Sequence, residues 1–81
     1  MDRELTAATL HIDGLDLAAT KVDLFSAFKN YRHLLKFVTI RSSTGGLNCA
    51  NVHFSTREAA EMACKELNGA LILGRRVTVD A

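Results

Sequence analysis

The sequence predicts an α+β fold whose elements follow one another in the order β-α-β-β-α-β. Four segments have the period-two alternation or the β-branched and aromatic residues typical of strands. Two other segments place apolar residues three and four positions apart, as one face of a helix does. The chain contains no proline and no internal repeat or linker. We therefore expect one domain over residues 1–81, with its core at about 9–80.

The first strand is predicted at residues 9–15, "TLHIDGL", where His11 and Asp13 alternate with leucine and isoleucine. Because successive side chains point to opposite faces, these two polar residues should share the solvent face. Gly14 is a typical strand breaker and should mark the end of this strand.

The first helix should begin after Thr20, which can act as its cap together with Asp23 three residues later. The helical pattern runs through "KVDLFSAFKNY". The residues at core spacing are Leu24, Ala27, Phe28 and Tyr31.

The second and third strands are predicted at 34–41 and 48–54 and should form a hairpin, because the flexible turn "SSTGG" lies between them. In "NCANVHF" the apolar residues occupy alternate positions, which leaves a thiol, an amide and an imidazole on the other face. These polar residues are Cys49, Asn51 and His53.

The second helix is predicted to follow a capping box formed by Ser55 and Glu58, and to stop at "NG", residues 68–69. Its core face carries Ala60, Ala63, Cys64 and Leu67. The segment "RRVTVDA" then alternates once more and is predicted as the last strand. Together the elements give the split βαβ, or ferredoxin-like, arrangement of two helices on one face of a four-stranded antiparallel sheet. The other sheet face stays open, and this topology alone does not decide the function.

Composition excludes several classes of function. Ten basic and nine acidic residues leave a net charge of +1, so attraction to a polyanion would need local clusters. Cys49 and Cys64 follow no disulfide spacing, and the N-terminus lacks the pattern of a signal peptide. We therefore expect an intracellular, reducing compartment. No apolar run approaches the roughly 20 residues of a membrane span, so no membrane association is expected.

Catalytic and metal-binding functions are disfavoured. Cys49 and His53 lie four residues apart on one strand, about 13 Å at roughly 3.3 Å per residue, too far to share one ion. A site across strands with His11 is conceivable. Cys49 and His11 could also form a nucleophile and base pair, but an open sheet offers no pocket that excludes water. We expect no enzyme activity, no cofactor and no metal.

The strand segments "LHIDGL" and "LNCANVHF" resemble the two short motifs of the RNA recognition motif (RRM) family. The resemblance extends from Thr9 to Asp80 and includes "TKVDLFSAFKNY", "FSTREAAEMACKELNG" and "GRRVTV". It implies the same fold and a role in binding single-stranded RNA. In the family, aromatic rings at three positions of the two motifs stack on bases. Those positions hold His11, Cys49 and Asn51 here, so most of the usual aromatic residues are missing.

The resemblance therefore implies a non-standard RRM that binds RNA weakly in isolation through a polar sheet face. Alternation in the second strand adds Phe37, Thr39 and Arg41 to this face. His11 and Phe37 would stack on bases, Asn51 and Asp13 would read base edges, and Arg41 with Arg76 would approach phosphates. The full set of expected RNA-binding residues is His11, Asp13, Phe37, Thr39, Arg41, Cys49, Asn51, His53, Arg76 and Thr78.

A protein-interaction module on the same scaffold is the alternative. Val22 and Phe25 lie off the core stripe of the first helix and could form an apolar docking surface, together with Met62 of the second helix. Alternatively, the sheet face itself could bind a protein. One RRM-like subclass grips tryptophan-bearing peptides with an Arg-x-Phe loop, but "ALI" at 70–72 does not match that motif.

The resemblance implies single-stranded RNA as the partner, within a ribonucleoprotein and in mRNA processing, and leaves a protein partner possible. The chain should be monomeric or weakly self-associating. Its location would be the nucleus, the cytoplasm or an RNA-containing organelle. Because the ends fall near the predicted domain limits, we expect a domain cut from a longer protein.

Overall fold

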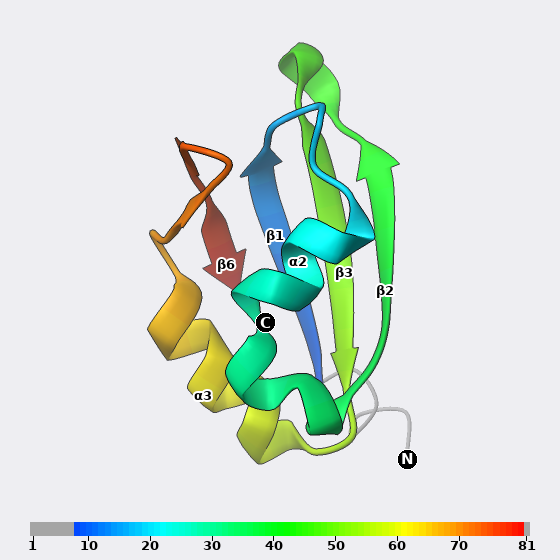
Figure 1. Cartoon of the computed structure of the whole chain (residues 1–81), viewed down its shortest axis with the longest axis vertical. Coiled ribbons are helices and arrows are strands. Elements are labelled where there is room, and N and C mark those ends of the chain that lie inside the picture. Colours follow the sequence, from blue (N-terminus) through cyan, green and yellow to red (C-terminus); the bar gives the residue numbers. More distant parts are fainter. Residues whose placement is uncertain (1–7, 81) are drawn as a thin grey trace.

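A computed structural model describes residues 8–80 of the chain. Four strands form an antiparallel sheet in the order β2-β3-β1-β6, and both α-helices pack on one of its faces (Figure 1). The strands are β1 (Thr9–Leu15), β2 (Leu35–Ser42), β3 (Asn48–Phe54) and β6 (Thr78–Asp80), and the helices are α2 (Lys21–Ala27) and α3 (Arg57–Leu67). This arrangement confirms the expected α+β, ferredoxin-like fold.

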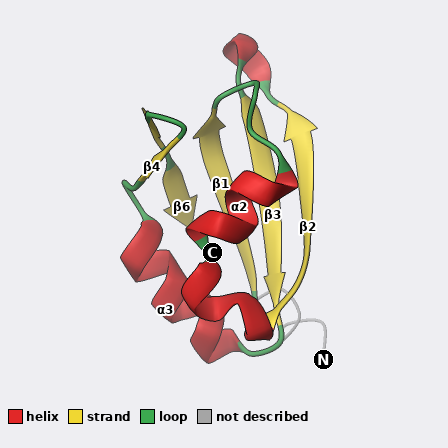
Figure 2. Ribbon diagram, in the orientation of Figure 1, coloured by secondary structure: helices red, strands yellow, loops and turns green. Residues whose placement is uncertain are grey.

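The core lies between the inner face of the sheet and the two helices (Figure 2). Leu10 and Ile12 of β1, Leu24 of α2 and Phe28 just after it are completely buried. The Phe28 ring meets the Phe54 ring edge-on, with the ring centres 5.8 Å apart. The alternation seen in the sequence therefore places the apolar half of each central strand against the helices and the polar half on the open side.

The first helix is shorter than the sequence predicts. The Asp23 carboxylate accepts a hydrogen bond from the Thr20 backbone N–H at 2.8 Å, as expected for this start. However, α2 ends at Ala27, and the chain continues as the tighter 3₁₀ helix η1 (Lys29–Leu34). Tyr31 is held in that segment by the Phe54 ring and by its hydroxyl, which donates to Glu66 of α3 at 2.5 Å.

The predicted capping box of the second helix is wrong by one residue. Thr56 is the cap, and its hydroxyl oxygen accepts from the Ala59 backbone N–H at 3.1 Å. Ser55 is kept out of this role because its own N–H donates to the Leu34 carbonyl at 2.6 Å, which holds it in an extended path. The predicted stop is confirmed, since α3 ends at Leu67 and Gly69 adopts a left-handed φ of +85°.

The last predicted strand is divided in the structure. A short hairpin pairs β4 (Leu71–Ile72) with β5 (Arg75–Arg76), and only β6 joins the main sheet. Val77 separates them because its backbone N–H donates to Ala70 and its carbonyl accepts from Gly69, both at 2.9 Å. No helix in the described part of the chain is long and apolar enough to cross a membrane.

Two β-bulges change which residues of the sheet face each other. On β1, Ile12 pairs with Ala50 and Leu15 with Asn48, so Asp13 and Gly14 together lie opposite the single residue Cys49. Gly14 has a φ of +86° there and lies inside β1, which covers Thr9–Leu15 as the sequence predicts.

The second bulge is on β2. Leu35 pairs with Phe54 and Phe37 with His53, which leaves Lys36 as the extra residue. Because of this extra residue, Leu35 packs against the core while Phe37 is exposed on the other face, although the two lie only two positions apart.

Candidate nucleic-acid interface

The predicted RNA-binding residues of the sheet lie in rows across its open face, opposite the helices. Their cross-strand register brings together residues that are up to about seventy positions apart in the chain. The rows are Phe37, His53 and Thr9; Thr39, Asn51, His11 and Asp80; and Arg41, Cys49, Asp13 and Thr78. The structure thus gathers nine of the ten predicted residues on one face.

An aromatic pair occupies the first row. The rings of Phe37 and His53 are stacked, with centres 4.1 Å apart and planes inclined by 21°. His53 is held from the other side by a 3.0 Å hydrogen bond between its Nδ1 and the Thr9 hydroxyl. Phe37 remains 52% exposed, so a large flat apolar surface faces solvent at the β2 side of the sheet.

His11 is the centre of the second row. Its Nδ1–H donates to Asn51 Oδ1 at 2.9 Å, and its Nε2 lies 3.3 Å from Asp13 Oδ2. The hydrogen bond that His11 donates to Asn51, followed by the attraction of Asp13 and Asp80, raises the pKa of His11 against the opposing effect of partial burial. Oxygens at both ring nitrogens therefore favour the imidazolium form of His11.

Replacing Asn51 with alanine should lower the pKa of His11. In the metal-free protein, a titration of the His11 ring signals by NMR should give a midpoint above the ordinary histidine value, and Asn51→Ala should move it down. Because folding raises the pKa of His11, the protonated His11 side chain stabilises the fold. This stabilisation is complete at pH values below the unfolded-state pKa and is lost as the pH rises through the folded-state pKa. The control is Thr39→Ala, on the far side of Asn51. Equal midpoints in the wild type and Asn51→Ala would contradict this assignment.

Between the second and third rows, a thiol, a carboxylate and an imidazole lie close together. The ligand atoms of Cys49, Asp13 and His11 all lie within 4.8 Å of one another. The sequence analysis considered a site across strands with His11 but did not include Asp13, because which residue lies opposite Cys49 depends on the strand register. At the end of the third row, Arg41 is exposed and takes part in none of the ion pairs found within residues 8–80.

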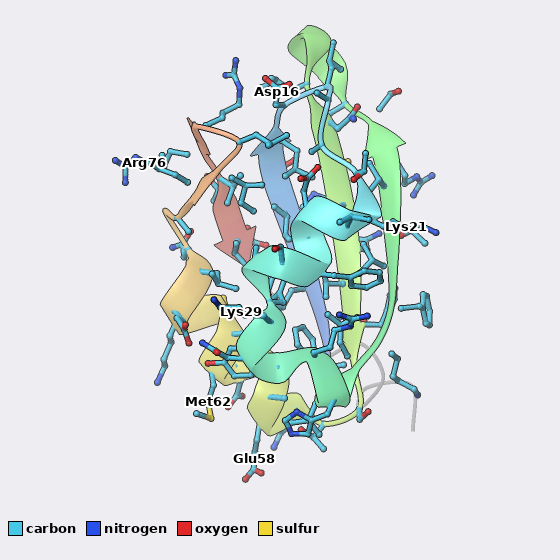
Figure 3. The ribbon with its side chains drawn as sticks, in the orientation of Figure 1. Asp16, Lys21, Lys29, Glu58, Met62 and Arg76 are labelled. Atoms are coloured by element: carbon cyan, nitrogen blue, oxygen red, sulfur yellow. The ribbon has the colours of Figure 1, made fainter. Side chains whose placement is uncertain are left out.

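Arg76 does not join the sheet-face rows. It lies on the β4–β5 hairpin, where its Nη1 donates to the Gly69 carbonyl at 2.9 Å. Figure 3 shows its side chain extending outward from that hairpin. Its neighbour Arg75 lies 3.9 Å from the Asp16 carboxylate, so both arginines of this segment have partners away from the rows.

The structure also separates the residues of the alternative docking surface. Val22 on α2 is 72% exposed and Met62 on α3 is 60% exposed, and Met62 projects outward in Figure 3. Phe25 instead packs against the core, and the Arg32 guanidinium lies 4.9 Å from its ring centre. Two exposed apolar side chains on different helices, with Phe25 partly covered, make a weaker surface than the sequence suggests.

Comparison with known proteins gives consistent matches. Residues 10–78 match the family described as the RNA recognition motif. Protein HSH49 of Saccharomyces cerevisiae is 35% identical over 80 residues, which are 98% of this chain and 38% of HSH49. The chain therefore spans less than two fifths of that relative.

Solved structures agree on the fold. The RRM3 domain of Mip6 superposes with a TM-score of 0.83 at 19% identity, covering 94% of both chains. The first two RRM domains of the yeast poly(U)-binding protein Pub1 give 0.78 at 25% identity, covering 89% of this chain and 44% of that one. A Sex-lethal protein–RNA complex gives 0.75 at 23% identity, covering 95% and 48%. With the family match extending over most of the chain, this protein belongs to the RNA recognition motif family.

Proposed function

We propose that this domain binds single-stranded RNA on the open face of its sheet, with the stacking platform displaced toward β2. The observation that carries the proposal is the exposed, stacked pair of Phe37 and His53. It lies one row from His11, on the same face that the family uses. Membership of the family supports RNA as the ligand, as do structural similarities to a protein solved with RNA and to a poly(U)-binding protein.

A base would stack on the face of Phe37 that His53 does not cover. Stacking on an aromatic side chain contributes about 1–3 kcal/mol per base and tolerates any base. His53 keeps the ring in place through its own contact with Thr9. One pre-positioned platform, with His11 as the second flat surface, supports weak binding to short single strands.

Asn51 would read base edges as a hydrogen-bond donor. Its Oδ1 already accepts from His11, which turns the amide nitrogen and its two N–H groups toward other partners. A carbonyl oxygen or an unprotonated ring nitrogen of a base matches those donors. Asp13, Thr39 and Thr78 supply further polar groups in the neighbouring rows.

Arg41 would contact a phosphate, and its removal should make RNA binding less sensitive to salt. Each phosphate neutralised on a single strand contributes a slope of about −0.7 to the dependence of log affinity on log salt. Arg41→Gln should therefore weaken RNA binding at low salt. It should also make the slope less negative by about 0.7, the contribution of one phosphate contact. Binding of fluorescent oligonucleotides over a series of salt concentrations measures both the affinity at low salt and the slope. Arg57→Gln, at the start of α3, is the charge-matched control, and an unchanged slope in Arg41→Gln excludes the phosphate contact.

An amide chemical-shift titration with short homopolymeric RNAs tests the proposal as a whole. Shifts should concentrate at Phe37, His53, Asn51 and His11 and be small on the outer surfaces of α2 and α3. If the sheet-face shifts stay within noise up to millimolar RNA, the proposed site is wrong. Shifts confined to the surroundings of Val22 and Met62, when a protein extract fraction is added instead, would favour the protein-binding alternative. The cellular location stays a prediction.

A further inference from the structure

We propose that His11, Asp13 and Cys49 form a binding site for a borderline-soft divalent cation such as Zn²⁺. The site lies on the open sheet face and does not depend on RNA binding. Its three side chains come from two strands that are joined by hydrogen bonds, β1 and β3. Two are half-buried and the third is exposed, so an ion can reach them from solvent.

The backbone fixes the positions of the three residues. His11 and Asp13 are two apart on β1 and share a face, and the pairing of Ile12 with Ala50 sets Asp13 beside Cys49, next to the β1 bulge at Gly14. Gly14 makes this bulge possible with its φ of +86°, and a Cβ at that position would lie 3.3 Å from the Arg76 carbonyl oxygen. The three ligands therefore depend on a conformation that the sheet itself imposes.

The distances suit a tetrahedral ion. His11 Nε2 and Asp13 Oδ2 are 3.3 Å apart. Two ligands bound at about 2.0–2.1 Å with a tetrahedral angle between them would be about 3.3–3.4 Å apart. All three ligand atoms lie within 4.8 Å, so a small rotation of the exposed side chains would bring the thiol to its place. The fourth position would be left to water.

Asn51 prepares His11 for this role. A histidine that binds a metal through Nε2 usually donates its Nδ1–H to an oxygen, which fixes both the tautomer and the ring orientation. Asn51 Oδ1 accepts that hydrogen bond at 2.9 Å. Thiolate, imidazole and carboxylate are the donor types of zinc sites, whereas Ca²⁺ and Mg²⁺ prefer oxygen ligands only. The donor set thus selects zinc-like ions.

Ion binding would proceed by proton displacement. The Cys49 thiol releases its proton to solvent as the metal–sulfur bond forms, and protonated His11 likewise releases its Nε2 proton to solvent before that nitrogen binds the ion. The carboxylate and the thiolate then balance the two positive charges of the ion. No electron transfer or further reactant is involved.

Titration of the full, reduced chain with Co²⁺ as a spectroscopic substitute for Zn²⁺ tests the proposal. We expect a thiolate-to-Co²⁺ charge-transfer band that saturates at one ion per chain and disappears when Zn²⁺ is added. Cys49→Ser should abolish the band. Cys64→Ser is the matched control and should keep it, because the Cys64 thiol is directed at the Val79 carbonyl, 3.4 Å away, on the helix side of the sheet.

Two further variants guard against a folding artefact. Asn51→Ala keeps all three ligands and should weaken the affinity about tenfold, as expected for loss of the partner that orients a histidine. Asp13→Asn should weaken it while keeping the thiolate band at high Co²⁺. The proposal is overturned if the wild type gives no band, if the band survives in a folded Cys49→Ser protein, or if only Cys64→Ser removes it.

Discussion

Replacing Phe28 with alanine should destabilise the fold by about 3–5 kcal/mol. The Phe28 side chain is completely buried and forms the centre of the helix-to-sheet contact through its edge-on packing with Phe54. Its removal loses the transfer free energy of the ring and leaves a cavity between α2 and β3. A chain of 81 residues has a total stability of only about 4–12 kcal/mol, so the variant should lose about a quarter or more of that stability.

Urea denaturation followed by circular dichroism measures this loss. Ile12→Val, in the same core, is a milder variant that should cost about 0.5–1.5 kcal/mol and still fold. Val22→Ala is the surface control, and its effect should stay within about 0.5 kcal/mol. If Phe28→Ala costs no more than Val22→Ala, the described core is wrong.

Replacing Phe37 with alanine should reduce the affinity for single-stranded RNA by about 5- to 150-fold, the equivalent of 1–3 kcal/mol for one lost stacking surface. The effect should be on binding alone, because Phe37 is 52% exposed and lies on the face away from the core. Fluorescence anisotropy with a short labelled oligonucleotide measures the affinity, and the denaturation midpoint checks the fold.

Two substitutions make this result specific. Phe37→Tyr keeps the ring and should retain most of the affinity. Met62→Ala removes a side chain of similar exposure from α3, on the other side of the molecule, and should leave RNA binding unchanged (Figure 3). Equal losses in Phe37→Ala and Met62→Ala would show that the displaced platform does not exist.

Much of the fold follows from local sequence. The alternation in β1 and β3 determines which residues are buried, and Leu24 and Phe28 have the helical spacing that places both in the core. Boundaries that depend on distant contacts were not predictable. Ser55 leaves the capping position because its N–H pairs with Leu34, and α2 tightens after Ala27 where Tyr31 packs against Phe54. Neither partner is visible from the helix sequence alone.

The face of each candidate residue was predictable, but its neighbours were not. Period-two alternation put Phe37, His53 and Asn51 on one side without saying which would touch. The stacking of Phe37 on His53 depends on the register set beside Lys36, and the approach of Asp13 to Cys49 depends on the pairing of β1 with β3. The hairpin that removes Arg76 from the sheet face was missed because its strands are only two residues long.

The extra residue Lys36 has a consequence for solubility. In the described sheet β2 is an outer strand, and its outward N–H and C=O groups could template pairing with a strand of another molecule. A bulge bends and twists such an edge, and a lysine ammonium on it must be desolvated before a second strand can dock. Lys36 thus protects the strand that carries Phe37 against edge-to-edge aggregation. The aromatic ring of Phe37 can therefore be exposed on this strand without making the domain prone to form fibres.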